Sequence, residues 1–242
     1  MEHLNFEIHG TGIHNKGAEL MAVAASSWIR NSFKNSKIAV SPAFGSFKDR
    51  CQYQFYSTSE FRGRFRTKTF SKIAPKPFLD AVGVIKSEEI DILLDASGFL
   101  FSDQWGFQHI RRNSESLLKK RSTVKSLIFL PQAWGPFQSK DVKRYTEKLL
   151  SRANLIFARD EVSYNHLRSL SLDLNVHIAP DFTILTPSIN DPCIPLPEKF
   201  VAIVPNSRMF DKSGNKNKYL EAMHSCIELL QKMGIKIVFV RH

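Results

Sequence analysis

The sequence predicts an open α/β fold built on a parallel sheet, and two observations support this prediction. Short apolar runs recur along the chain, each ending in Gly, Pro, Asn, Asp or Arg, and helix-like stretches follow most of them. This alternation is typical of parallel strands joined by right-handed crossovers. In such a sheet ligands bind at the carboxyl ends of the strands, so polar residues there are the candidate functional residues. The strand-and-loop units are FEIHGTGIHNKGAEL, DILLDASGFLFSDQWG, SLIFLPQAWGPF, LIFARDEVS and VHIAPDF.

The first elements follow from hydrophobic periodicity. Residues 4–10 are expected to form a strand, AELMAVAASSWIRNSF a helix, and KIAV a second strand. One stripe of this helix is expected to face the core, and it consists of Leu20, Val23, Ala24 and Trp28. Residues 42–77 are predicted to be an irregular and basic surface insertion, because they are long for a structureless loop.

The middle of the chain continues the alternation of helix and strand. PFLDAVGVIKSEE is predicted to be a helix that leads into the strand DILLDAS. Further helices are expected around residues 108–120, 139–151 and 160–170. These segments complete a predicted N-terminal domain over residues 1–186.

The pattern changes after this domain. TPSINDPCIPLPEK contains four prolines and almost no periodicity, so residues 187–199 are predicted to be an interdomain linker. Beyond it, FVAIVPN and IKIVFVRH read as strands and KYLEAMHSCIELLQKM as the helix between them. One β-α-β unit cannot cover both faces of a parallel sheet. We therefore expect residues 200–242 to be part of a second domain inside which the chain breaks off; the alternative is that they extend the first sheet.

Composition narrows the class of protein. An apolar content of 43% supports a hydrophobic core, and no apolar run approaches the roughly 18 residues that span a bilayer. The N-terminus does not read as a signal peptide. The three cysteines are scattered, with no metal spacing and no disulfide framework. A cytoplasmic protein is the simplest expectation.

The chain is strongly basic, with a net charge of +11. Such a surface attracts phosphates, acidic glycans, nucleic acid or anionic lipid. The segment 61–77 is rich in Arg and Lys, contains no acid, and is interleaved with aromatic residues. One interpretation is that the segment contacts an anionic polymer, or an anionic membrane at its inner face. The other is that it is a solvated basic loop. No nucleic-acid-binding module is visible, so nucleic acid is not an expected partner.

The loop GTGIHNKGAEL joins the first strand to the first helix. Such a turn can aim backbone N–H groups and a helix N-terminus at an anion. Its glycine spacing matches neither a dinucleotide fingerprint nor a P-loop. Asn15 and Gly17 are candidate ligand-binding residues, with Asn15 either binding a polar group or holding the turn. Glu19 is a further candidate that could instead cap the first turn.

The next two strands also end in candidate binding residues. Ser97 and Gly98 follow DILLDA, and glycine there permits a close approach of backbone to ligand. Asp103 could bind a hydroxyl or cap the next helix. Gln132 and Trp134 leave the strand SLIFLPQ, where Trp134 could stack on a sugar face or pack beneath the loop.

The sharpest local signal is FARDEVS. Asp160 is a good N-cap for a helix that Ser163 supports, which frees Arg159 to bind a carboxylate or phosphate. A structural Arg159–Asp160 pair is the alternative. Asp181 ends another strand just before the linker, and it could bind ligand or cap structure.

The C-terminal part of the chain adds three candidates. Asn206 and Arg208 lie in VPNSRM, directly after a predicted strand. His242 ends the last strand and could act as a general acid or as a hydrogen-bond donor to substrate. The remaining histidines show no pairing that indicates a metal site.

Taken together, these motifs resemble the polysaccharide pyruvyl transferase family. The matching pieces are Asn15-Lys16-Gly17-Ala18-Glu19, Asp95-Ala96-Ser97-Gly98, Gln132-Ala133-Trp134-Gly135-Pro136, Arg159-Asp160-Glu161-Val162-Ser163, Ala179-Pro180-Asp181, Val204-Pro205-Asn206-Ser207-Arg208-Met209 and His242. Each piece alone is weak, but their order and spacing over nearly the whole chain are specific. The chain departs from the family pattern at Ala96-Ser97, where a Gly-Gly pair is common, and it ends before the family's Arg-Leu-His motif.

The resemblance implies a particular fold and activity. The fold would be two Rossmann-like domains arranged as in GT-B glycosyltransferases, with the active site between them and the second domain C-terminally incomplete. The activity would be transfer of a pyruvyl group from phosphoenolpyruvate to hydroxyls of a saccharide acceptor, which could be lipid-linked, to form a ketal in a surface polysaccharide or its precursor. No metal or organic cofactor is implied.

The residue chemistry agrees with this expectation. Phosphoenolpyruvate carries a phosphate and a carboxylate, which Arg159 and Arg208 could bind, and His242 is the candidate acid that protonates the enol carbon. The acceptor hydroxyl would be oriented by Asn15, Asp103 or Gln132. Two alternatives stay open: a GT-B-like glycosyltransferase that uses a nucleotide sugar, and a catalytically inactive truncated fragment.

Overall fold

The computed structural model describes residues 4–59, 74–186, 195–212 and 214–240. The chain divides into two compact units, Met1–Pro187 and Ser188–His242. The predicted linker at 187–199 lies outside the described residues up to position 194, as do positions 61–73 of the basic segment. The two units are therefore described separately.

The first unit is built on an eight-stranded sheet in which every pair of neighbours is parallel. The strand order is β4-β3-β2-β1-β5-β6-β7-β8. The bounds are β1 Asn5–His9, β2 Lys37–Val40, β3 Tyr56–Thr58, β4 Val84–Ile85, β5 Ile92–Asp95, β6 Ser126–Gln132, β7 Leu155–Ala158 and β8 Val176–Ile178. The predicted α/β class with a Rossmann-like parallel sheet is confirmed. The order reverses between β1 and β5, and ligands bind beside such a reversal in open α/β sheets.

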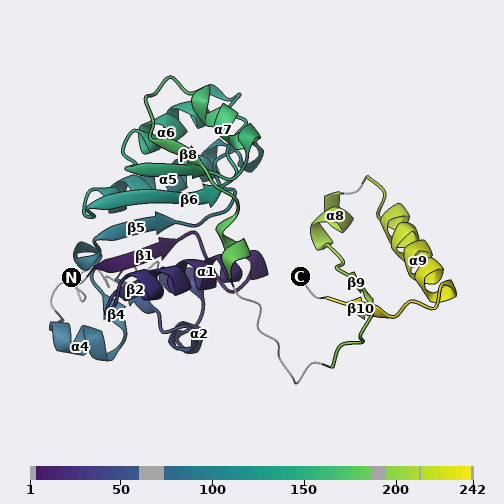
Figure 1. Cartoon of the computed structure of the whole chain (residues 1–242). Helices are drawn as coiled ribbons and strands as arrows, with labels where there is room; N and C mark the ends of the chain where they lie inside the picture. Colours follow the sequence, from purple (N-terminus) through teal and green to yellow (C-terminus); the bar gives the residue numbers. More distant parts are fainter. Residues whose placement is uncertain (1–3, 60–73, 187–194, 213, 241–242) are drawn as a thin grey trace. The chain divides into compact units, whose positions relative to one another are not determined.

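Helices flank both faces of this sheet (Figure 1). The longer ones are α1 Lys16–Ser32, α5 Phe107–Arg121, α6 Lys140–Leu150 and α7 Glu161–Arg168, and the short ones are α2 Phe47–Gln52 and α4 Lys76–Ala81. Four 3-10 turns complete the unit: η1 Pro42–Phe44, η2 Ser87–Glu89, η3 Asp103–Trp105 and η4 Phe182–Leu185. The helices expected around 108–120, 139–151 and 160–170 are confirmed.

The two faces of the sheet have separate cores, because successive side chains of a strand point to opposite faces. On one face Phe6 and Ile8 of β1 pack with Ala22, Ala25 and Ile29 of α1. On the other face, residues of β5, β6 and β7 pack with α5, α6 and α7. The residues of β1 that alternate with Phe6 and Ile8 are polar, which places Glu7 and His9 on the α5 face.

The apolar stripe predicted for the first helix is right at Ala24, which is buried, but wrong at Leu20 and Trp28. Leu20 and Trp28 are largely exposed, and the buried residues of α1 are Ala22, Ala24, Ala25, Ser26 and Ile29. Small side chains on the inner surface let the helix backbone approach the sheet closely. Large residues at the margins of that surface then remain in contact with solvent.

The prediction that residues 42–77 are irregular is also wrong for the described part of that segment. Residues 42–59 contain η1, α2 and β3, and a capping box formed by Ser46 and Asp49 begins α2. The helix predicted over 77–89 ends at Ala81, because Gly83 adopts φ +66° and the two-residue strand β4 follows it. Both segments contain a strand of only two or three residues, and such strands are too short to show a period.

The second unit contains a two-stranded parallel sheet, formed by β9 Val201–Ile203 and β10 Ile237–Phe239. Its helices are α8 Ser207–Lys212 and α9 Lys216–Lys232, and Asn215 caps α9. The predicted strand-helix-strand order is confirmed. Within the described residues β9 and β10 pair with each other and not with the larger sheet, so this unit does not extend it.

Candidate functional site

A pocket of about 410 Å³ lies beside the reversal of strand order in the first unit. Six of the residues singled out by the sequence line this Arg159 pocket: Asn15, Gly17, Ser97, Gly98, Arg159 and Asp181. They come from four separate segments of the chain, and parallel strands bring these segments to one edge of the sheet. The other lining residues are Leu20, Met21, Phe99, Trp105 and Thr183.

Asn15 holds the first wall of the Arg159 pocket in place. Its Oδ1 accepts a hydrogen bond from the backbone N of Ala18 at 3.1 Å, so Asn15 is the N-cap of α1. Asn15 and Gly17 then lie at the positive end of a 17-residue helix. This end of the helix dipole stabilises negative charge in its vicinity.

Arg159 is held by its backbone, while its side chain remains half-exposed. Its N–H donates to the carbonyl of Gln132 at 3.0 Å. The next residue, Asp160, is the N-cap of α7, as predicted, and its Oδ1 accepts from the backbone N of Ser163 at 2.7 Å. This hydrogen bond holds the pKa of Asp160 below its ordinary value. Arg159 is thus fixed at the point where a strand turns into a helix.

The side chain of Arg159 pairs with another predicted residue. Its Nη1 lies 3.5 Å from Oδ2 of Asp181, and both side chains keep roughly a third of their surface exposed, 39% and 32%. The other carboxylate oxygen of Asp181 accepts from the backbone and hydroxyl of Thr183. The ion pair is therefore long and exposed to solvent, and such pairs contribute little stability. An anionic ligand can replace this contact.

Glu19 lies one turn into α1, next to the pocket-lining residue Leu20. Its carboxylate accepts from Lys16 at 2.6 Å and from the hydroxyl of Tyr53. Burial acts to raise the pKa of Glu19, but these two hydrogen bonds outweigh it and leave the pKa below the ordinary value. The hydrogen bond to Glu19, with partial burial, raises the pKa of Tyr53 to about 12. Glu19 therefore ties α1 to the segment that follows α2.

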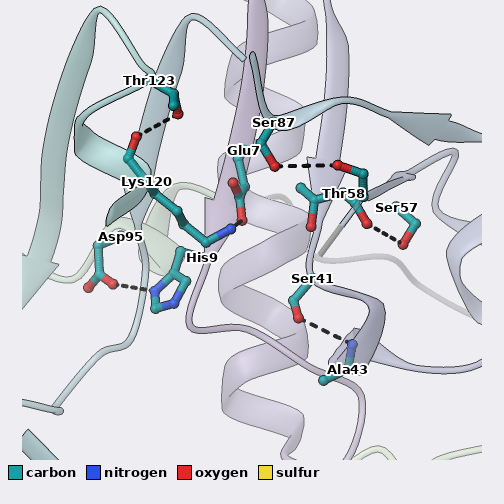
Figure 2. A network of polar contacts seen from close by, with 11 residues as sticks. Glu7, His9, Ser41, Ala43, Ser57, Thr58, Ser87, Asp95, Lys120 and Thr123 are labelled. Carbon is teal, nitrogen blue, oxygen red and sulfur yellow. Dashed lines mark hydrogen bonds and ion pairs between the residues drawn. The ribbon is translucent and has the colours of Figure 1, made fainter. Parts of the chain in front are cut away.

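Beneath Ser97 lies a buried carboxylate that connects β1, β5 and β6. Asp95 accepts from the hydroxyl of Ser97 at 2.9 Å and from the side-chain amide of Gln132 at 3.0 Å. It also contacts Nδ1 of His9 at 2.8 Å, across the β1–β5 register (Figure 2). Gly10 is required here, because a Cβ at this position would come within 2.1 Å of the Ser97 hydroxyl and its φ is +80°.

Like Glu19, three more predicted residues of the first unit lie outside the pocket wall. Gln132 and Trp134 are buried, and Trp134 stacks on Phe101 and donates from its indole to the carbonyl of Phe157. Trp134 therefore packs beneath its loop, which is one of the two readings that the sequence left open. Asp103 accepts from the backbone N of Gln138 at 2.6 Å and of Ser139 at 3.1 Å, and so stabilises the loop before α6.

The exposed tryptophan of the pocket is Trp105, which the sequence reasoning did not select. It is 43% exposed, and its ring lies beside Phe99 and His109. The available signal was its position in FSDQWG, two residues after Asp103. Trp134 was selected because it follows a more regular strand. A side chain so close to a central strand is, however, readily buried.

The candidates of the second unit are less fully described. Asn206 stands at the start of α8, where its Oδ1 accepts from the backbone N of Met209 at 3.4 Å. Arg208 is a residue of α8, but its side chain lies outside the described part, and so does His242.

The described residues lack two other kinds of feature. They contain no group of three or more His, Cys, Asp or Glu side chains that could hold a metal ion. No helix among them is long and apolar enough to cross a membrane.

The fold and the Arg159 pocket define a Rossmann-like α/β protein with a pocket at the carboxyl edge of its sheet, where such folds bind ligands. The chain belongs to the polysaccharide pyruvyl transferase family, whose family model matches residues 15–242. The resemblance predicted from the sequence motifs is thereby confirmed. The family is one of transferases, and its name implies a saccharide acceptor. A comparison with curated proteins gives no match.

Proposed function

We propose that this protein transfers a pyruvyl group from phosphoenolpyruvate to hydroxyls of a saccharide, with formation of a ketal. The observation that carries the proposal is the convergence of Arg159 and the capped N-terminus of α1 on one pocket. Both features favour an anion, and phosphoenolpyruvate is a small anion with a phosphate at one end and a carboxylate at the other.

The donor would bind by displacing a carboxylate. In the described structure Arg159 faces Asp181 at 3.5 Å, so an incoming carboxylate or phosphate can take the place of this contact. Among the described residues that line the pocket, Arg159 is the one with a cationic side chain. A donor with several negative charges needs more than one cation, so we propose Arg208 as a second cationic ligand. We propose His242 as the acid that protonates the enol carbon.

Part of the saccharide acceptor would stack on Trp105, the exposed tryptophan of this pocket, whose ring lies beside that of His109. A sugar ring presents an apolar face of C–H groups that stacks on indole, and Trp105 offers such a surface. A surface polysaccharide or its lipid-linked precursor is the proposed acceptor, because the chain carries a net charge of +11 that favours an anionic membrane surface. Peripheral contact at the inner face of the membrane is part of this proposal, as is the GT-B-like arrangement of two domains.

The test is a binding titration of the full chain with phosphoenolpyruvate, and with a nucleotide diphosphate sugar as the competing ligand. We expect saturable binding of phosphoenolpyruvate, and Arg159→Ala should weaken it about 10- to 100-fold, the range for loss of a hydrogen bond to a charged group. Arg168→Ala is the matched control, because Arg168 is exposed at the other end of α7. This substitution removes the same charge without changing the Arg159 pocket.

Each other outcome selects an alternative. Binding of the nucleotide sugar alone would favour a glycosyltransferase. Binding of neither ligand would favour a catalytically inactive protein. Equal loss of affinity in Arg159→Ala and Arg168→Ala would mean that net charge, and not the Arg159 pocket, attracts the donor.

A further inference from the structure

A second pocket of about 520 Å³ lies on the α5 face of the sheet. We call it the His9 pocket. Its walls are the end of β1 with His9, the loop after β2 with Ser41, and the outer turns of α5 with His109 and Asn113. Ser97 lines both this pocket and the Arg159 pocket, so the two cavities share a residue of the turn after β5.

The lining of the His9 pocket combines apolar surface with several polar groups, and it offers little free positive charge. Lys120 is buried, and its Nζ lies 2.7 Å from Oε1 of Glu7, which neutralises it (Figure 2). Lys119 is exposed at the rim. The Oγ1 of Thr11 is buried and has no hydrogen-bond partner among the described residues. Hydroxyl, amide and imidazole groups of this kind suit a neutral ligand that is rich in hydroxyls.

His9 is held in one tautomer by its buried partner. Asp95 is fully buried and accepts from Ser97 and Gln132, so its carboxylate is surrounded by donors. Nδ1 of His9, at 2.8 Å, therefore carries a proton and donates it to this carboxylate. Nε2 is left with a lone pair, and within the described part of the chain no group hydrogen-bonds to it. His9 lines the pocket, so an oriented proton acceptor borders the cavity.

From these contacts we propose that the His9 pocket is the saccharide acceptor subsite, and that Nε2 of His9 takes the proton of the attacking hydroxyl. This inference rests on the proposed pyruvyl transfer and names two parts of it, the place of the acceptor and the base. The location of the pocket beside the Arg159 pocket puts acceptor and donor on either side of Ser97.

The proposed step balances without an oxidant or reductant. The acceptor oxygen forms a bond to C2 of phosphoenolpyruvate while its proton passes to Nε2, and C3 takes up a proton as the C2–C3 double bond becomes a single bond. The bond from C2 to the phosphate oxygen then breaks, and phosphate leaves with the electron pair. A second hydroxyl attacks C2 and loses its proton. Two O–H bonds are broken in total; one proton balances the new methyl group and the other leaves with phosphate.

The first test uses ¹⁵N NMR of the histidine side chains in the full chain. We expect His9 to show the Nδ1–H tautomer, and we expect methyl glycosides of glucose, galactose and mannose at millimolar concentration to shift its Nε2 signal. Asn113→Leu should remove that response, because it replaces a pocket amide with an apolar group. A His9 signal that no glycoside shifts, or that inorganic phosphate shifts as strongly, would overturn the acceptor subsite.

The second test separates the base from the pocket. In a transfer assay His9→Gln should lower kcat about 100- to 10,000-fold, the range for loss of a general base, while the affinity for phosphoenolpyruvate and the thermal midpoint stay close to those of the unsubstituted chain. His224→Gln, at a 74% exposed side chain of the second unit, is the control. A kcat unchanged in His9→Gln would overturn the proton-transfer role.

The two proposals fail in different ways. If glycosides shift the His9 signal but phosphoenolpyruvate does not bind, the subsite stands and the donor assignment falls. If phosphoenolpyruvate binds and depends on Arg159 while glycosides leave His9 unchanged, the proposed function stands and the acceptor subsite falls.

Discussion

Two polar pairs lie side by side on the same face of β1 and differ in what they leave open. Glu7 contacts Lys120 of α5 at 2.7 Å, and both side chains are buried, at 2% and 5% exposure. His9, two residues further along the strand, contacts Asp95 of β5 at 2.8 Å and is 14% exposed. The first pair is enclosed, whereas the second keeps one ring nitrogen at a pocket.

Within three residues of β1, one pair stabilises the fold and the other leaves a ring nitrogen available for chemistry. A buried ion pair must be satisfied, because removal of one partner leaves the other charged and desolvated. Glu7 and Lys120 therefore specify how α5 docks on the sheet. His9 is held just as firmly through Nδ1, but its Nε2 is available to a ligand. The same strand thus anchors a helix at its centre and presents a reactive group at its carboxyl end.

The largest expected effect comes from breaking the enclosed pair. Lys120→Met should lower the free energy of unfolding by about 3–5 kcal/mol, because Glu7 is left as an unpaired buried charge. Urea denaturation measures this change. Lys125→Met is the matched control, because Lys125 pairs with Asp91 at a similar 2.9 Å but is 68% exposed, and it should cost less than about 1 kcal/mol.

The double variant Glu7→Leu with Lys120→Met sharpens this prediction. It should recover much of the lost stability, since a buried pair can often be replaced by apolar residues without net cost. A single Lys120→Met variant that is no less stable than Lys125→Met would show that the enclosed pair does not anchor α5.

A smaller effect is expected at the exposed carboxylate that caps α7. Asp160→Ala should cost about 1 kcal/mol at neutral pH, whereas Asp160→Asn should cost less because an amide oxygen also caps. The pKa of Asp160 lies below its ordinary value of 3.8, so its contribution is present above that pH and is lost as the pH falls through the folded-state pKa. The stability gap between Asp160→Ala and the unsubstituted chain should therefore narrow in acid. A gap independent of pH from neutral to strongly acidic conditions would contradict the charged cap.

The smallest expected effect concerns the partly buried contact of Tyr53 with Glu19. Glu19→Gln should lower the pKa of Tyr53 from about 12 toward its ordinary value of 10.0, because the negatively charged acceptor is removed. Because the folded-state pKa is raised, the contact stabilises the fold below pH 10, and this contribution is lost as the pH rises through about 12. Solvent screens the partly exposed contact, so the loss of stability in Glu19→Gln at neutral pH should be small. Ultraviolet titration of tyrosinate, with Tyr53→Phe identifying the signal, measures the pKa. An unshifted signal in Glu19→Gln would contradict the contact.

Local chemistry was enough to predict much of this protein from its sequence. The main strands follow from apolar runs, and the cap of α7 follows from Asp160 and its position before Ser163, because caps depend on neighbours three residues away. The order of the motifs also predicted the family. The loops that form the Arg159 pocket could be named because parallel strands must end at the same edge of the sheet.

Tertiary structure alone decided which of these residues face a ligand. Trp105 is exposed and Trp134 buried, although both follow strands, because burial depends on what packs above each loop. Strands β3 and β4 are too short to show a period, and they form by pairing with neighbours already in place. His9 and Asp95 are 86 residues apart, and nothing local marks them as partners. The sequence by itself determined the elements and their order, whereas contacts between distant segments determined the pockets, because a side chain's exposure and partners are set by the whole sheet and not by its neighbours in the chain.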